Sequence, residues 1–165
     1  YILYITEIIY LLREIKIIAW TTLIFGIILY IADKNELNKK MSTDLNFKSI
    51  LLIGLFQMLS LIPGVSRAGI TITAARTLKF NRVDASKISF LLSIPALSGA
   101  SFLSLKDVLQ EQIEFSYLVI IAIISSFIFS YITVNYFLRY INKFSMNIFV
   151  IYRIVLALIL FIIIY

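Results

Sequence analysis

The stretch that decides the fold of this chain reads Ile62-Pro63-Gly64-Val65-Ser66-Arg67-Ala68-Gly69-Ile70-Thr71. Pro63 lacks a backbone N–H and disfavours helix at the residue before it, so an incoming helix is predicted to end at Ile62. Gly64 lets the chain turn back without a Cβ clash. Ser66 is a good N-cap, and we therefore predict that a second helix begins at Arg67.

Residues 49–77 around this break are predicted to form a re-entrant helix–loop–helix. Its arms, 49–62 and 66–77, would be about 21 and 18 Å long as helices, whereas the hydrocarbon core of a bilayer is about 30 Å thick. Basic residues flank both outer ends, which places those ends on one side of the membrane. The alternative is two short tilted spans with a kink at the proline. Irregular backbone at membrane depth is buried by protein or lines a wet cavity, so the turn is a candidate site.

The composition of the whole chain indicates an integral membrane protein. Of its 165 residues 61% are hydrophobic and 15% are charged, and the mean hydropathy is +0.99. A soluble fold and a disordered chain are both excluded, because neither carries so much apolar surface. The net charge of +6 lies in short clusters between apolar runs, so it indicates topology and not a nucleic-acid partner. The chain has no Cys and no His, which excludes disulfides and removes the commonest general base.

Outside the hairpin, charged linkers separate four further apolar runs. These runs are residues 17–32, 88–105, 115–138 and 144–165. The linkers beside the hairpin and after residue 138 are basic, whereas the linker before residue 115 is acidic. The positive-inside bias therefore places the basic linkers in the cytoplasm and the acidic linker outside. We predict an all-α, polytopic membrane helix bundle with a re-entrant helix–loop–helix, in a single membrane domain of residues 1–165.

The turn of the predicted hairpin has the features of an anion site. A helix that begins at Arg67 points its unpaired N–H groups and the positive end of its dipole at the turn. Arg67 adds a permanent charge with a planar fork of donors, and Thr71 lies one turn later on the same face. An arginine at membrane depth costs about 2.5–3.5 kcal/mol, which an anionic ligand would offset. The alternative is that Arg67 snorkels or pairs with a carbonyl, and that Ser66 only caps the helix.

Other polar residues lie in apolar segments. Gln57 lies one or two turns before the break, where it either reaches a bound head group or bonds across the hairpin. Arg153 interrupts the last apolar run and either lines the cavity or pairs with a buried carbonyl. Ser89 and Ser93 share one helix face, a spacing typical of close helix packing.

The residues around the break also resemble a known family. The segments that carry the resemblance are Gly54-Leu55-Phe56-Gln57, Leu61-Ile62-Pro63-Gly64-Val65-Ser66-Arg67, Gly69, Thr71 and Ser89-Phe90-Leu91-Leu92-Ser93-Ile94-Pro95, with Gly26, Asp33 and Tyr152-Arg153 in support. They are similar to the undecaprenyl-diphosphate phosphatases of bacteria, also called bacitracin-resistance proteins. The resemblance implies hydrolysis of a polyprenyl diphosphate to the monophosphate and inorganic phosphate. That reaction renews the lipid carrier of peptidoglycan synthesis and gives bacitracin resistance.

The resemblance also implies a site, an architecture and a location. The catalytic candidates are Arg67 and Ser66, and the substrate-binding candidates are Gly64, Val65, Thr71, Gln57 and Arg153. No metal ligand is predicted in this chain. The family fold is an inverted repeat with two re-entrant hairpins, of which residues 49–77 would be the second. The expected location is the bacterial inner membrane, and one assembly that the sequence allows is a homodimer.

Two departures from the family pattern affect the expected activity. Ala68 stands where the family usually has serine, which removes one hydroxyl donor. The family's first motif, a pair of glutamates four residues apart followed by Ser-Ser-Thr-Gly-His, is missing, since Glu7 and Glu14 do not have that spacing and His is absent. We therefore expect an N-terminally truncated fragment, the C-terminal portion of a family protein, that is inactive alone. A divalent cation, Mg²⁺ or Ca²⁺, would be held mostly by the missing part.

A function of a different class remains as an alternative. Broken helices with an anion at a helix N-terminus are also typical of secondary transporters. The chain would then be half of a lipid flippase or transporter. A phosphatase needs an acidic, metal-binding motif opposite Arg67, whereas a transporter needs only a binding site and two gates.

Overall fold

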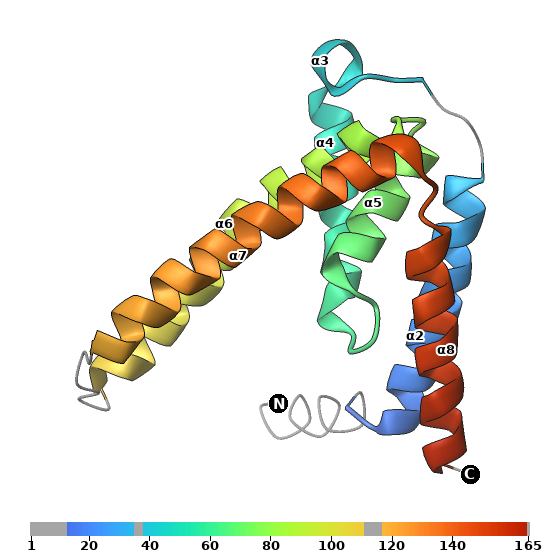
Figure 1. Ribbon diagram of the computed structural model, residues 1–165. Helices are drawn as coiled ribbons and strands as arrows, with labels where there is room; N and C mark the ends of the chain where they lie inside the picture. Colours follow the sequence, from blue (N-terminus) through green and yellow to red (C-terminus); the bar gives the residue numbers. More distant parts are fainter. Residues whose placement is uncertain (1–12, 35–37, 111–116, 165) are drawn as a thin grey trace. The chain divides into compact units, whose positions relative to one another are not determined.

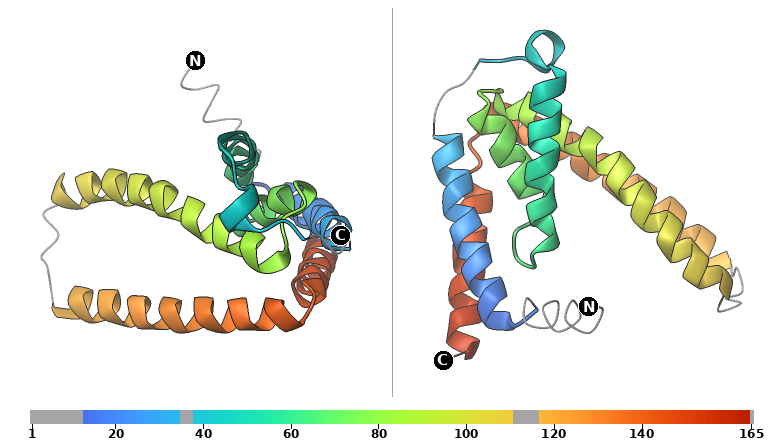
Figure 2. Two further views of the ribbon diagram at one scale, coloured as in Figure 1. Left: turned by 90° about the horizontal axis from the view of Figure 1, so that it is seen from above. Right: turned by 180° about the vertical axis from the view of Figure 1, so that it is seen from behind.

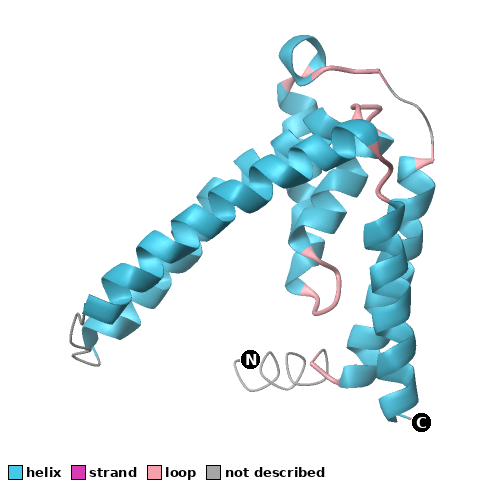
Figure 3. Ribbon diagram, in the orientation of Figure 1, coloured by secondary structure: helices cyan, strands magenta, loops and turns pink. Residues whose placement is uncertain are grey.

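The computed structural model describes residues 13–34, 38–110 and 117–164, and the side chains of all of these except 106–110. Its helices, labelled in Figure 1, are α2 Ile15–Asp33, α3 Met41–Asp44, α4 Phe47–Gln57, the 3-10 helix η1 Met58–Leu61, α5 Arg67–Thr77, α6 Arg82–Gln110, α7 Tyr117–Lys143 and α8 Asn147–Ile164. Described loops, pink in Figure 3, lie between η1 and α5 and between α7 and α8, and a single β-bridge pairs Lys39 with Phe80 in the described part of the chain. The prediction of an all-α fold is confirmed.

Four of the described helices, α2, α6, α7 and α8, are long and apolar enough to cross a membrane. Helices α2 and α6 contain the predicted spans 17–32 and 88–105. Helix α8 begins at Asn147, three residues later than the predicted start at residue 144. Residues 115–116 and 165 of the last two predicted spans lie outside the described residues, as does Glu7. Helix α6 begins six residues earlier than the predicted span at residue 88, because Asn81 caps it by accepting a hydrogen bond from Asp84 N at 2.9 Å. Many large apolar side chains on the four helices are exposed, as expected for surfaces that face lipid. The chain is a polytopic membrane protein.

The chain divides into two compact units. Unit 1 comprises Tyr1–Ser89 and Ser145–Tyr165, and unit 2 comprises Phe90–Phe144. In unit 2 the later part of α6 and the whole of α7 run antiparallel (Figure 2). The rings of Phe90 and Phe137 meet edge to face with their centroids 5.6 Å apart.

In unit 1, α2 and α8 lie side by side and antiparallel (Figures 1 and 2). Gly26 of α2 lies against Arg153 of α8, since a Cβ at this glycine would lie 3.3 Å from Arg153 Cβ. Small residues let two membrane helices approach closely, which increases the van der Waals contact between them. Helix α5 packs against both α2 and α4.

Helix α4 with η1 and helix α5 form an antiparallel hairpin (Figure 1). Each α-helical arm has 11 residues, so each is about 16 Å long, roughly half the thickness of a bilayer core. Lys39 N, which precedes the hairpin, donates to Lys79 O, which follows it, at 3.1 Å, so both outer ends lie together. Its bounds, 47–77, agree with the predicted 49–77, and Asn46 sets the earlier start by capping α4. The re-entrant position in a bilayer and the inverted repeat remain predictions.

Candidate functional site

The tip of the hairpin, residues 62–66, reverses the chain in a tight turn. Ile62 is extended, with φ −78° and ψ 121°, as expected before a proline. Its carbonyl accepts a hydrogen bond from Val65 N at 3.2 Å. Gly64 has φ +89°, a left-handed value that glycine adopts without steric cost. The predicted break between the two arms is confirmed.

Ser66 caps the second helix, as predicted. Its Oγ accepts a hydrogen bond from Gly69 N at 3.3 Å, and its carbonyl accepts one from Ile70 N at 3.0 Å. Ser66 has φ +55°, a strained value for a residue with a side chain, so surrounding contacts must hold it there. Its exposed hydroxyl keeps a proton to donate, because accepting from Gly69 uses only a lone pair. Arg67 follows as the first residue of α5 and is half-buried.

Helix α2 holds the tip from one side through two threonines. Thr21 Oγ1 lies 2.7 Å from the carbonyl oxygen of Pro63, and Thr22 Oγ1 lies 3.4 Å from that of Gly64. A Cβ at Gly64 would collide with the Thr21 hydroxyl and lie 2.8 Å from the carbonyl oxygen of Ile18. Gly64 is therefore required twice, for its backbone angle and for its close approach to α2.

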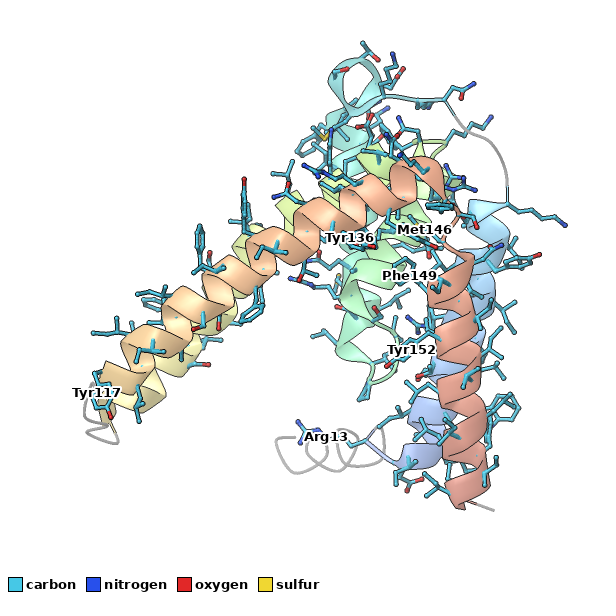
Figure 4. The ribbon with its side chains drawn as sticks, viewed as in Figure 1. Arg13, Tyr117, Tyr136, Met146, Phe149 and Tyr152 are labelled. Carbon is cyan, nitrogen blue, oxygen red and sulfur yellow. The ribbon has the colours of Figure 1, made fainter. Side chains whose placement is uncertain are left out.

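Arg153 reaches the tip from α8, where its neighbour Tyr152 is labelled in Figure 4. Its Nη2 donates to Gly64 O at 2.7 Å, and longer contacts join Nη1 to Val65 O at 3.5 Å and Nε to Thr22 O at 3.4 Å. Arg153 is only 7% exposed. Of the two roles that the sequence left open for it, the structure shows the pairing with buried carbonyls. Its predicted contact with substrate is untested.

Thr71 and Ser89 join α5 to the first turns of α6. Thr71 is fully buried, and its Oγ1 lies 2.6 Å from Ser89 Oγ and 2.9 Å from Arg67 O. Since a hydroxyl has one proton and two lone pairs, these contacts use much of its capacity. Ser89 thus bonds to a neighbouring helix, whereas the close helix packing expected for Ser89 and Ser93 stays a prediction. The substrate-binding role of Thr71 stays a prediction.

Gln57, the last residue of α4, is half-buried. Its Oε1 atom is buried and has no hydrogen-bond partner among the described residues. A buried acceptor without a partner costs about 1–3 kcal/mol. The atom can therefore accept a bond from a ligand or water, and a role in substrate binding stays a prediction.

A charged cluster that the sequence did not reveal lies at the opposite end of the hairpin. Asp33 Oδ1 lies 3.2 Å from Arg76 Nε and 2.8 Å from Arg82 Nε. Its Oδ2 accepts a hydrogen bond from the backbone N of Met146, just before α8 (Figure 4), at 3.0 Å. One carboxylate thus ties together the ends of α2, α5, α6 and α8. In the sequence the two arginines are among the basic residues near the outer end of the predicted hairpin, and no local pattern connects them with the distant acid.

The described residues do not provide a metal site. No group of three or more His, Cys, Asp and Glu side chains in that part of the chain could hold a metal ion. Asp33, the most buried acid of unit 1 among those described, is engaged by two arginines. The predicted Mg²⁺ or Ca²⁺ therefore does not fit the residues present, and a site made by other residues stays a prediction.

The fold and the tip together define an integral membrane protein whose candidate site is the turn of a broken helical hairpin. Residues 2–159 match the family described as Bacitracin resistance protein BacA, and the chain belongs to that family. The four candidate spans and this membership make it a multi-pass protein of the bacterial inner membrane.

Three similar proteins all carry the name undecaprenyl-diphosphatase. The protein from Pelagibacter ubique is 68% identical over 153 residues, which are 93% of this chain and 60% of that relative. Those from Elusimicrobium minutum and Teredinibacter turnerae are 43% and 44% identical, over 91% and 92% of this chain and 57% and 58% of their own lengths. The chain thus spans about three-fifths of the length of the curated relatives it matches.

Proposed function

We propose that the full-length product of the gene encoding this chain hydrolyses undecaprenyl, or another polyprenyl, diphosphate to the monophosphate and inorganic phosphate. Family membership supports the reaction. The observation that assigns this reaction to a site is the structure of the tip, where Ser66 caps α5 and Arg67 is the first residue of that helix. The reaction would recycle the lipid carrier of the cell wall and give bacitracin resistance.

The tip suits a diphosphate because residues that carry donors, Ser66 and Arg67, begin α5 there. The first N–H groups of α5 and the positive end of its dipole favour an anion. The guanidinium of Arg67 can grip two phosphate oxygens at once. Ser66, which immediately precedes Arg67, adds a hydroxyl donor, and its strained backbone indicates a fixed position. Donors fixed in advance stabilise charge that develops on the phosphoryl oxygens in the transition state.

The remaining substrate-binding candidates would assist these two residues. Gly64 and Val65 would allow close approach of the backbone, and the side-chain amide of Gln57 would donate from its Nε2 to a phosphate oxygen. Thr71 lies one turn deeper and would act at the base of the site. The head group would thus lie against α5 while the polyprenyl chain extends into lipid.

The groups that activate the attacking water are expected to lie outside the described residues. The chain has no His, and its described part has no metal cluster. We therefore propose that this chain alone binds the head group but does not hydrolyse it. Assembly as a homodimer belongs to the same proposal and is checked by the mass of the detergent-purified complex.

Phosphate release from undecaprenyl diphosphate in detergent micelles tests the reaction. The full-length product is expected to release one phosphate per lipid, and the 165-residue chain none. A matched control replaces Arg139, an exposed arginine of α7, by Ala and is expected to leave the rate unchanged. Failure of the full-length product to release phosphate, together with transfer of the intact lipid between the leaflets of a vesicle, would overturn the proposal in favour of a flippase.

A further inference from the structure

The side chain of Arg153 runs from α8 to the tip through a gap left by two glycines. A Cβ at Gly26 of α2 would lie 3.3 Å from Arg153 Cβ and 3.7 Å from its Nε, and a Cβ at Gly69 of α5 would lie 3.0 Å from its Nη1. The shortest distance at each glycine, 3.3 Å at Gly26 and 3.0 Å at Gly69, is shorter than the distance in most real Cβ contacts. The two glycines thus give an arginine room to cross between helices that are close to each other.

At the end of this path, the guanidinium meets backbone oxygens. Its shortest bond, 2.7 Å, is to Gly64 O, and its other contacts reach Val65 O and Thr22 O. Gly64 and Val65 immediately precede Ser66, whose φ of +55° is strained. A turn with two left-handed residues holds its shape only if its surroundings over-determine it. Arg153 supplies that restraint from α8, and the threonines of α2 supply it from the other side.

We infer that Arg153 is a positioning residue, which acts on the substrate only through the tip by fixing the carbonyls of Gly64 and Val65 and so the placement of Ser66 and Arg67. This inference rests on the proposed function and departs from the expectation that Arg153 itself binds substrate. Its guanidinium already makes one charge-assisted hydrogen bond and two longer contacts to backbone carbonyls. These contacts occupy donors that would otherwise bind a substrate.

The first test separates positioning from direct binding by kinetics of the full-length product. Arg153→Met keeps an unbranched side chain but leaves the tip carbonyls without these donors. We expect kcat for phosphate release to fall about tenfold or more, with a smaller change in KM, because misplaced groups lose mainly transition-state contacts. Arg153→Lys, which keeps one donor group, is expected to lie between the wild type and Arg153→Met. A rise in KM at unchanged kcat, or no change in either, would overturn the inference.

The second test displaces Arg153 without replacing it. Gly26→Ala is expected to lower kcat more in the wild-type protein than in the Arg153→Met protein, because the added methyl group, 3.3 Å from Arg153 Cβ and 3.7 Å from its Nε, can displace a guanidinium only where one is present. Gly54→Ala is the matched control, since a Cβ at Gly54 meets nothing within 4 Å. If the fold-reductions in kcat caused by Gly26→Ala and by Arg153→Met multiply in the double variant, the inference is contradicted.

A third test measures the mobility of the tip instead of activity, so its result does not depend on whether the proposed reaction is correct. A spin label on Ala68→Cys, next to Arg67, reports the mobility of the start of α5. Its spectrum is expected to show greater mobility in the Arg153→Met and Gly26→Ala proteins, and no change with Gly54→Ala. Unchanged mobility in the Arg153→Met and Gly26→Ala proteins would refute the positioning role, whereas absence of phosphate release in the wild type would refute only the proposed reaction.

Discussion

The Asp33 carboxylate lies 3.2 Å from Nε of Arg76, and their side chains are only 3% and 2% exposed. Arg76 also donates to Phe80 O at 2.9 Å, and Arg82 reaches the same carboxylate from the start of α6. This pair fixes the outer end of the hairpin to α2, whereas Arg153 and the threonines fix the tip. The hairpin is thus held at both ends by polar contacts within an otherwise apolar unit.

Replacement of Asp33 by Asn is expected to destabilise the protein strongly. It leaves Arg76 and Arg82 close together without a counter-charge, and breaking a buried pair costs about 3–5 kcal/mol. Thermal unfolding in detergent measures the loss. Lys87→Gln breaks the more exposed Asp84–Lys87 pair, 3.8 Å apart, and is expected to change stability by less than about 1 kcal/mol. Equal melting temperatures for the Asp33→Asn protein and the wild type would show that the cluster does not carry stability.

Replacement of Arg67 by Ala in the full-length product is expected to abolish phosphate release while membrane insertion continues. Arg67→Lys is also expected to lose much of the rate, because a point charge replaces a two-pronged donor. Steady-state rates with undecaprenyl diphosphate, compared at equal amounts of membrane-inserted protein, give the measurement. Wild-type turnover of Arg67→Ala would show that this residue is only structural.

Ser66 can be tested for capping and for chemistry separately. Ser66→Ala removes the cap of α5 and is expected to cost about 0.5–2 kcal/mol of stability along with activity. Ser66→Asn keeps a capping oxygen and tolerates the left-handed backbone, so it is expected to keep stability and lose activity. Melting temperature and phosphate release are measured on both variants. An active, stable Ser66→Asn protein would restrict Ser66 to capping.

The 2.6 Å contact between Thr71 and Ser89 predicts coupled stability effects. Thr71→Val leaves the buried Ser89 hydroxyl without this partner, and Ser89→Ala does the reverse, each at about 1–3 kcal/mol. The double variant is expected to lose less than the sum of the two. Unfolding of the four proteins measures the difference. Strictly additive losses would indicate that the two hydroxyls do not interact.

Much of the hairpin could be predicted because the rules at the break are local. Pro63 ends a helix, Gly64 turns the chain and Ser66 caps the second arm, and none of these effects depends on distant residues. The spans could be predicted from hydropathy for the same reason. Helix starts at Phe47 and Arg82 differed from prediction because asparagine caps extend helices into polar segments.

The contacts that fix the tip could not be predicted, because they join residues far apart in the sequence. Thr21 meets Pro63 across 42 positions, and Arg153 meets Gly64 across 89. The sequence identified Arg153 as an unusual charge in an apolar run and left its partner open. A backbone carbonyl has no sequence signature, so only the packing of α8 against α2 reveals which oxygen it reaches.

The sequence by itself determined a polytopic helical membrane protein with a broken hairpin, since hydropathy and the steric rules of proline, glycine and serine act within a few residues. The tertiary structure alone decided what restrains that hairpin: an arginine from the last helix, threonines from α2 and the carboxylate of Asp33. These restraints depend on which helix faces meet, and burial makes each polar group find its partner wherever the fold brings one close.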